Sequence, residues 1–448
     1  MFYYFSMRLR LHKRYGSAND RWQARTNLDD FKLEALKSAC ASNDAITQIF
    51  MNHLRHGHLP INNLTLGVIR RMSQHNGDMA KAMKRLLVID GPRISFSQPF
   101  KPIRISTMEP ELVFQRTGWR KEDLLAIVYL WSESEYVSHK RHRFPRDLAI
   151  LMALERIRSG ADFTTFVATY GGESRRWSEA FDWFVCIGYE YAKALMQEDA
   201  LMRYVEQGEE CNTAINNVLT ESGFVPGEGE NNCVGLLDAT MIDIANPGNA
   251  VVQNSFYSGY SGKTCLKALT LIFPNGMTGF IAFSSGRRPD HAIARDFEIN
   301  AKIRKFVRAV LNGRPGSYYF YGDKIFSISG FIRSPNDVDN RRRFSREFVA
   351  EHPQWIQRMR QQDEAMKQVR AAVEHSYASI KNEMRYTENR MKHCLSRSQM
   401  QVSKLVPLLF FIADLKTICV GNQRNAKFLM KPPTMAAYIA GLENINSF

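Results

Sequence analysis

Paired cysteines, long apolar runs, internal repeats and low-complexity tracts are all missing from this sequence of 448 residues. The seven cysteines are irregularly spaced and form no C-x-x-C pair, which argues against a zinc knuckle or a disulfide framework and favours a reducing compartment. The longest apolar run, Leu405 to Ala413, is interrupted by Pro407 and is far shorter than the roughly 20 residues that span a bilayer. The apolar start, Met1 to Phe5, is too short for a signal-peptide core. We therefore expect a soluble intracellular protein without a membrane partner.

The composition is that of a folded, basic protein. Hydrophobic residues make up 44% of the chain, which is enough for sizeable cores. At roughly 100–200 residues per domain, the length suggests two or three domains. Lys and Arg number 60 against 45 Asp and Glu, a net charge of +15. This excess suits a polyanionic partner such as nucleic acid, although a merely basic protein explains the charge alone equally well.

The first part of the chain is predicted to be all-helical. Residues 1–110 show irregular helical spacing and loops, and no pattern in them reveals a role. Residues 111–200 have apolar side chains at helical spacing, and the predicted helices are Lys121–Trp131, Pro145–Ser159, Asp162–Tyr170 and a long helix from about Ser174.

A short helix, the Gly171-Gly172 turn and a longer helix have the outline of a helix-turn-helix. In that arrangement the start of the last helix faces DNA, which makes Arg175 and Arg176 candidate DNA contacts. The alternative is an ordinary helical bundle whose arginine pair is solvated. The pattern alone favours this alternative.

The pattern changes after a connection at residues 223–232 that is rich in Gly, Glu and Asn. The predicted strands are Cys233–Ile244, Thr264–Phe273, Thr278–Phe283 and Ser317–Tyr321. The predicted helices are Asp290–Leu311, Gln362–Tyr386 and Gln399–Cys419. The Asn275-Gly276 turn makes the second and third strands a hairpin. An antiparallel meander, a crossover helix and a parallel strand beside the first form an α/β order. This order matches a ribonuclease H-like core, preceded here by an all-α region.

Three acidic residues lie in three different elements of this predicted core. Asp238 lies within the apolar first strand, where a carboxylate is costly unless it is paired or binds a metal. Asp323 follows the fourth strand, and Glu374 borders the apolar stripe of a helix. Because the first and fourth strands are neighbours in the ribonuclease H-like order, both aspartates come side by side within reach of the helix. Cleavage of a phosphodiester by two Mg²⁺ or Mn²⁺ ions needs such a set of carboxylates.

Each of these acids also has a less specific explanation, because a strand aspartate is more often salt-bridged and a helix glutamate is usually solvated. Three other acids compete with them. Asp243 is predicted to point to the opposite face of its strand, and Asp290 to cap the start of a helix. Glu383 lies two and a half turns beyond Glu374 on the same predicted helix. The spacing of the His and Cys residues gives no zinc pattern.

The acids lie within a series of motifs that are specific in combination. The motifs are Leu237-Asp238-Ala239-Thr240, Tyr257-Ser258-Gly259, Gly286 with Pro289-Asp290, Tyr321-Gly322-Asp323-Lys324, and Arg370 with Val373-Glu374, Tyr377 and Lys381. On these motifs, residues 233–422 resemble the DDE endonuclease domain of the Harbinger-type transposases and their domesticated relatives. The resemblance implies that Asp238, Asp323 and Glu374 are the metal-binding, catalytic acids. Residues 423–448 would then be a C-terminal tail.

The resemblance implies a transposase-derived DNA endonuclease that uses Mg²⁺ or Mn²⁺. The alternative is a domesticated, catalytically silent protein that binds DNA or a partner; a ribonuclease or resolvase on the same core is a more remote one. In the related transposons a Myb-like accessory protein often recognises the transposon ends. The sequence does not decide whether this chain has such a partner or associates with itself. DNA as substrate implies the nucleus, with the cytoplasm as the other location.

Basic residues outside the core supply further candidate DNA contacts. The resemblance supports the helix-turn-helix, because residues 145–196 lie where the family has one. Arg341, Arg342, Arg343 and Lys381 are predicted to contact DNA. The cluster His139–Arg143 has the same chemistry, although a nuclear import signal or a solvated loop explains either cluster of basic residues as well.

Overall fold

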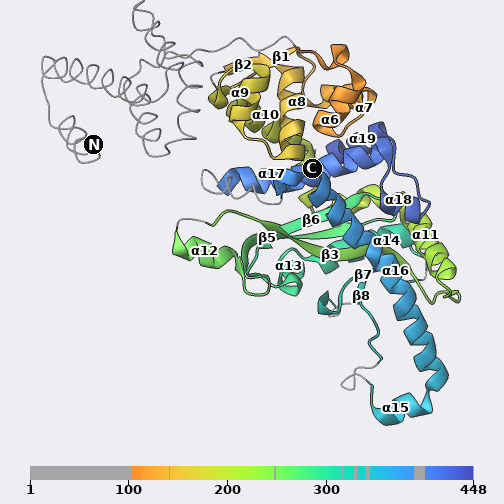
Figure 1. Cartoon of the computed structure of the whole chain (residues 1–448). Helices are drawn as coiled ribbons and strands as arrows, with labels where there is room; N and C mark the ends of the chain where they lie inside the picture. The colour runs from red at the N-terminus through yellow and green to blue at the C-terminus, as the bar shows by residue number, and fades with distance from the viewer. Residues whose placement is uncertain are drawn as a thin grey trace, which may run out of the picture. The chain divides into compact units, whose positions relative to one another are not determined.

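The fold in Figure 1 is a computed structural model that describes residues 103–140, 142–246, 249–314, 316–326, 330–338, 344–387 and 399–446. The interpretation of residues 1–102 and the DNA contacts predicted at Arg341, Arg342 and Arg343 therefore lie outside the described residues. The helical segment and the sheet described next belong to one compact unit, Gln98–Phe448.

Within the described residues, a six-stranded mixed sheet forms the centre of this unit. Its strands are β3 (Cys233–Asp243), β4 (Tyr257–Ser258), β5 (Lys263–Ile272), β6 (Thr278–Ser285), β7 (Tyr319–Tyr321) and β8 (Ile332–Arg333). The order is β4-β5-β3-β7-β8, and β6 pairs with β5. β5 is antiparallel to both β3 and β6, whereas β7 is parallel to β3. The predicted meander and the predicted parallel pairing of the first and fourth strands are confirmed.

Close packing at the centre of the sheet explains its residue types. A Cβ atom on Gly235 would lie 2.4 Å from the ring of Phe320 and 2.9 Å from the backbone O of Ile272, so β3 approaches its neighbours where only glycine fits. The rings of Phe273, Phe306 and Phe320 pack together with centroids 5.5–6.0 Å apart. These contacts bury the helix that carries Phe306 against the sheet.

The predicted crossover helix is present as two helices rather than one. They are α13 (Asp290–Asp296) and α14 (Ile299–Leu311). The chain bends between them because Glu298 adopts a left-handed conformation with φ of 51°. The apolar periodicity continues through the bend, which is why the sequence pattern suggested a single helix.

Most of the described residues before the sheet are helical. The elements are η1 (Ile105–Thr107), α6 (Pro110–Thr117), α7 (Lys121–Trp131), α8 (Arg146–Ser159), α9 (Phe163–Tyr170), α10 (Ser174–Ala192), η2 (Lys193–Met196), η3 (Ala200–Gln207) and α11 (Gly208–Glu221). Left-handed glycines end α6 and α8, at Gly118 and Gly160. The carboxylate of Asp162 caps α9 by accepting the backbone N–H of Thr165.

The prediction that residues 111–200 are all-helical is wrong at one place. Two antiparallel strands, β1 (Tyr136–His139) and β2 (His142–Pro145), lie between α7 and α8. Their ends pair at His139 and His142, and Lys140, which follows β1, has a positive φ of 53° of the kind that tight hairpin turns use. The charged residues at this turn suggest a loop, which hides the short alternation of apolar residues on either side.

The remaining elements are helices that pack on the sheet or extend from it. They are α12 (Ala250–Phe256), η4 (Lys324–Phe326), α15 (Arg346–Glu351), α16 (Pro353–Glu383), η5 (Arg385–Thr387), α17 (Gln399–Val420), α18 (Gln423–Lys427) and α19 (Met435–Asn446). α16 starts earlier than predicted, with Pro353 at its first position. Residues 423–446, predicted as part of a tail, form α18 and α19.

The longest apolar run of the sequence lies inside the molecule. Residues 405–412 are all buried within α17, which packs against α10 on one side and β6 on the other (Figure 1). Phe411 lies in a group of aromatic rings with Trp131, Tyr191 and Tyr438. Among the described residues, no helix has both the length and the apolar character needed to cross a membrane.

Candidate active site

Asp238 lies within β3, and Asp323 lies just beyond the end of β7, the strand that pairs with β3 in parallel. β3 and β7 pair with Leu236 opposite Tyr321. Each aspartate stands two residues beyond this pair, so the register that joins Leu236 to Tyr321 also brings the two acids together. β7 ends at Tyr321, and in the turn that follows the backbone N–H of Lys324 donates to the carboxylate of Asp323 at 2.6 Å.

Glu374 comes to this place on α16, and Tyr377 fixes the helix there. The Tyr377 side chain is buried, and its hydroxyl donates to the backbone O of Asp238 at 2.9 Å. The same hydroxyl bonds Thr270 Oγ1, and Thr270 is the cross-strand partner of Asp238. Because the single phenolic proton goes to Asp238, the Thr270 hydroxyl is the donor in the second bond. The helix that carries Glu374 is thus bonded to the strand that carries Asp238.

Arg370 lies among the three carboxylates. It stands one turn before Glu374 on α16, with Nη1 3.4 Å from Asp323 Oδ1 and Nη2 4.0 Å from Glu374 Oε1. Its charge also acts on Asp238. The Nε atom of Arg370 is buried and has no hydrogen-bond partner among the residues that the structure describes. Arg370 therefore supplies the positive charge around which acids from three elements gather.

The pKa of Asp238 is raised to about 6, chiefly because burial removes the carboxylate from water. A hydrogen bond from the backbone N–H of Ala239 and the charge of Arg370 oppose this rise, whereas the charges of Glu374 and Asp323 add to it. A cation bound beside these acids would favour their ionised forms.

The three carboxylates fit divalent metal ions in donor chemistry and in charge. Mg²⁺ takes carboxylate oxygens and completes its shell with water and phosphate. The side chains of Glu374 and Asp323 are 63% and 45% exposed, so both have room to turn toward an ion. In the arrangement described, Arg370 lies between them, and no group of three or more His, Cys, Asp or Glu among the described residues is gathered closely enough to hold a metal. In this arrangement the positive charge beside the carboxylates is therefore that of Arg370.

The competing acids are each engaged elsewhere. Asp243 pairs with Lys263 at 3.1 Å, and Asp290 pairs with the mostly buried Lys267 at 2.9 Å. The expected capping role of Asp290 is wrong, because the N-cap of α13 is Pro289 and Asp290 is the first residue inside the helix. Lys416 of α17 forms an ion pair with Glu383.

The segment that carries the three acids matches a known family. A family model described as DDE superfamily endonuclease matches residues 237–410. This segment resembles a DDE endonuclease. No curated protein and no solved structure matches the chain. The DDE segment, as residues 237–410 are called below, contains β7, α16, the part of β3 from Leu237 onward and all three predicted acids.

The predicted DNA contacts in the described residues are Arg175 and Arg176 of α10 and Lys381 of α16. They differ in the contacts that their side chains make within the protein. Arg175, at the start of α10, is 66% exposed and lies 3.4 Å from Glu179 on the next turn. Arg176 donates to the backbone O of Arg143, so it also attaches α10 to the β1–β2 hairpin. Lys381 lies two turns beyond Glu374 and therefore on the same side of α16.

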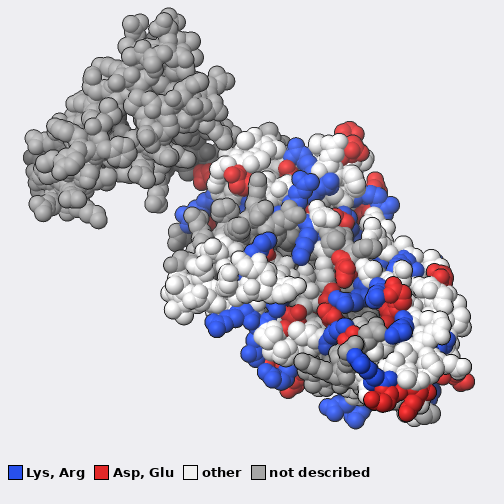
Figure 2. All heavy atoms as spheres, turned by 60° about the horizontal axis from the view of Figure 1, so that its bottom comes forward, with Lys and Arg blue, Asp and Glu red and all other residues white. Residues whose placement is uncertain are grey.

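Carboxylates of α10 hold the basic cluster at His139–Arg143. His139 and Lys140 contact Asp182, and His142 lies 2.6 Å from Glu179. The guanidinium of Arg143 lies over the ring of Tyr136. Figure 2 shows the same mixture more widely: on that face, Lys and Arg side chains form several groups among Asp and Glu rather than one basic patch.

Sequence reasoning missed the roles of Arg370, Tyr377 and Asp363. Arg370 and Tyr377 belong to the helical motif around Glu374, but no sequence pattern indicates that Arg370 lies among the acids or that Tyr377 bonds two strands. Asp363 accepts the backbone N–H groups of Asn336 and Asp337 at 2.8 and 3.0 Å, and so holds the loop after β8 against α16. We find no sequence signal for this last contact.

Proposed function

We propose that this protein is a transposase-derived DNA endonuclease in which Asp238, Asp323 and Glu374 hold divalent metal ions. The observation that carries the proposal is the gathering of these acids around Arg370 from β3, the turn after β7 and α16, all inside the DDE segment. The strand order supports a ribonuclease H-like core, because the first and fourth strands of the core pair in parallel and bring the two aspartates together.

The side chains of the proposed active site would have different roles in phosphodiester hydrolysis. Divalent ions, when bound, supply the positive charge that activates water and stabilises the leaving oxygen. Asp238 is held rigidly in the central strand, whereas Glu374 is exposed and adjustable. Arg370, once displaced from Asp323 and Glu374, has a guanidinium free to bind a phosphate oxygen of the DNA. Tyr377 keeps the helix and the strand in register.

The test is metal-dependent nicking of supercoiled DNA by the purified protein. We expect cleavage with Mg²⁺ or Mn²⁺, and a loss of about a hundred-fold or more in Asp238→Asn, Asp323→Asn and Glu374→Gln, because each amide keeps the shape and removes a charged ligand. DNA binding should survive, since Lys and Arg supply most of that affinity.

Asp243→Asn is the matched control for these three variants, because Asp243 pairs with Lys263 on an exposed part of the same strand. It should cleave nearly as well as the parent protein. A parent that cleaves, together with a Glu374→Gln variant that cleaves equally well, would remove Glu374 from the ligand set.

A second function, a domesticated protein that binds DNA or a partner without cleaving, is favoured by one observation. Arg370 already neutralises part of the acidic cluster, so the fold does not need a metal ion to balance these charges. A parent protein that never cleaves with either metal, with DNA ends supplied, would establish this second function. Arg370→Ala would then lower stability without any effect on chemistry.

The finer assignments belong to the same proposal. The motif series supports a Harbinger-type origin, with a Myb-like accessory protein and self-association as partners to be tested. Arg175, Arg176 and Lys381 are the proposed DNA contacts among the described residues. A DNA substrate favours location in the nucleus, which imaging of a fluorescent fusion would check.

A further inference from the structure

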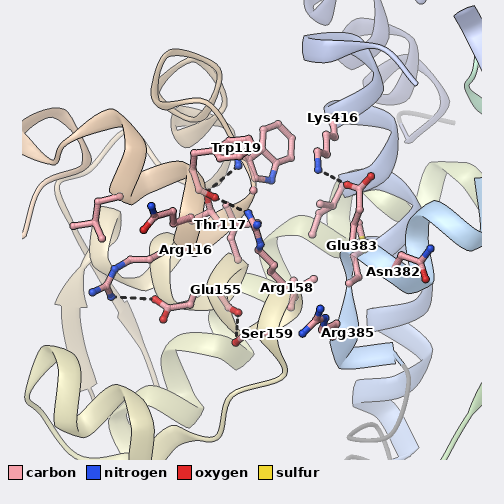
Figure 3. Close-up of a pocket in the computed structure, with 18 of the residues that line it drawn as sticks. Arg116, Thr117, Trp119, Glu155, Arg158, Ser159, Asn382, Glu383, Arg385 and Lys416 are labelled. Carbon is pink, nitrogen blue, oxygen red and sulfur yellow. Dashed lines mark hydrogen bonds and ion pairs between the residues drawn. The ribbon is translucent and has the colours of Figure 1, made fainter. Parts of the chain in front are cut away.

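A cavity of about 680 Å³ lies between the helical bundle and the end of α16 (Figure 3). α6 and α8 form one wall, and the end of α16, η5 and α17 form the other. Glu383 in this wall is nine residues from Glu374, which places it about 14 Å further along α16 and on the opposite side of the helix. The cavity is therefore separate from the candidate active site. Its volume is within the range of about 300–1,000 Å³ typical of small-molecule sites.

The walls of this cavity carry an excess of positive charge. Each lining glutamate has a cation partner, and the ion pairs are Arg116–Glu155 and Glu383–Lys416. Two lining arginines, Arg158 and Arg385, have no carboxylate partner within the part of the chain that the structure describes. They come from opposite walls, as Figure 3 shows. These two guanidinium groups are therefore the cations of the wall whose charge is not balanced by a described carboxylate.

The same cavity has an apolar, aromatic side. Phe114 and Leu112 line it and are 45% and 39% exposed, so both present apolar surface to a ligand. The guanidinium of Arg158 lies 5.7 Å from the centroid of the Phe114 ring, and its Nη1 donates to the backbone O of Phe114 at 2.5 Å. The planar cation and the ring are thus held beside each other, a surface suited to a flat aromatic group.

We propose that this cavity binds a nucleotide, with its phosphate at Arg385 and Arg158 and its base against Phe114 and Leu112. Arginine binds phosphate oxygens through charge-assisted hydrogen bonds, and bases stack on aromatic and guanidinium planes. A free mononucleotide and an unpaired nucleotide of a DNA strand present the same groups. The proposal requires neither metal nor cleavage, so its outcome is independent of the function of the three acids.

The test is binding to the full-length protein in the presence of EDTA, measured by calorimetry with dAMP and pyrophosphate and by anisotropy with a short single-stranded oligonucleotide. Arg385→Gln removes an exposed cation without disturbing a described contact. It should lower the affinity for dAMP and for pyrophosphate at least about ten-fold, as expected for a lost charged hydrogen bond. Phe114→Ala should lower the affinity for dAMP about five-fold or more and leave the affinity for pyrophosphate unchanged, because stacking acts on the base alone. Arg308→Gln, an exposed arginine of α14, is the matched control.

The possible outcomes distinguish a free nucleotide from a nucleotide within a DNA strand, and they test the proposal. Saturable dAMP binding with this pattern identifies a free nucleotide as a sufficient ligand. Binding of the oligonucleotide alone, lowered by Arg385→Gln and Phe114→Ala but not by Arg308→Gln, identifies a nucleotide within a strand. Equal affinities for all probes in the parent and both cavity variants would overturn the proposal, as would a Phe114→Ala variant that binds dAMP and the oligonucleotide like the parent.

Discussion

Tyr377 shows how one hydroxyl group organises the candidate active site. It accepts a hydrogen bond from Thr270 on β5 and donates one to the backbone of Asp238 on β3, while its own helix carries Glu374. Burial raises the pKa of Tyr377 far above its ordinary value, so the hydroxyl keeps its proton and acts as a donor throughout the physiological range. A phenylalanine would fill the same space and lose both bonds.

We expect Tyr377→Phe to fold, with a free energy of unfolding lower by about 1 kcal/mol for the lost hydrogen bonds. Because the acids would be held less firmly, half-maximal cleavage should require a several-fold higher Mg²⁺ concentration, and calorimetry should show weaker Mn²⁺ binding. Tyr318→Phe is the control, because Tyr318 is half-buried and its hydroxyl has no hydrogen bond within the described residues. A lower maximal rate with an unchanged Mg²⁺ requirement would mean that Tyr377 does not position the metal ligands.

At the residue scale, the sequence was informative about acids and silent about their partners. An aspartate inside an apolar strand is rare enough to be noticed, which made Asp238 a candidate, and the strand order then indicated Asp323. An arginine on a helix is ordinary by contrast. Its place among the acids depends on how α16 crosses the sheet, which no local pattern encodes, so the role of Arg370 required the structure.

At the scale of elements, four strands of the sheet were predictable, whereas the two-residue strands β4 and β8 and the small hairpin were not. β3, β5 and β6 are long apolar runs, and the Asn-Gly turn joins the last two. β1 and β2 have four residues each, and their turn is charged. Their stability comes from α10, whose carboxylates Asp182 and Glu179 hold the basic turn. Tertiary contacts of this kind determine whether short strands form, and the local sequence gives little indication of them.

The start of α10 is the element whose role in DNA binding can be tested most simply. Arg175 is largely exposed, and within the described part of the chain its side chain pairs only with Glu179 on the next turn, so Arg175→Ala should leave the fold intact. If its guanidinium contacts phosphate, the slope of log affinity against log salt should fall by about 0.9, the value for one contact. DNA binding measured over a series of salt concentrations gives this slope. The double change with Arg176 is less informative, because Arg176 also holds the hairpin.

Arg104→Ala provides the comparison for Arg175→Ala. Arg104 is 67% exposed and pairs with Glu135, so it matches Arg175 in exposure and in having a glutamate partner. Removal of Arg104 should leave the salt slope unchanged. Equal slopes for the parent and both variants would show that the start of α10 does not contact phosphate, and would favour the ordinary helical bundle.

At the scale of the whole molecule, a buried polar network joins the sheet to the C-terminal helices. The carboxylate of Asp414 on α17 accepts hydrogen bonds from the backbone N–H and hydroxyl of Thr278 on β6 and from the hydroxyl of Tyr438 on α19. The charges of Arg424 and Arg203 also act on it. Burial nevertheless dominates and raises the pKa of Asp414 to about 6.

This raised pKa gives the stability of the protein a pH dependence opposite in sign to that of an ordinary salt-bridged carboxylate. Above about pH 6 Asp414 is ionised in both the folded and the unfolded chain, and the full cost of burying its charge is present. As the pH falls through about 6, the folded protein takes up the proton first and gains stability, until the unfolded chain also protonates near pH 4. The gain between pH 7 and pH 5 is about 1 kcal/mol.

Asp414→Asn removes this titration and keeps the shape of the side chain. The difference in the free energy of unfolding between parent and variant, measured by urea unfolding, should therefore shift by about 1 kcal/mol in favour of the parent when the pH falls from 7 to 5. Other titrating groups are common to both proteins and cancel in this difference. A difference that stays constant over the same range would mean that Thr278, Tyr438 and the two arginines stabilise the Asp414 carboxylate enough to keep its pKa near the ordinary value.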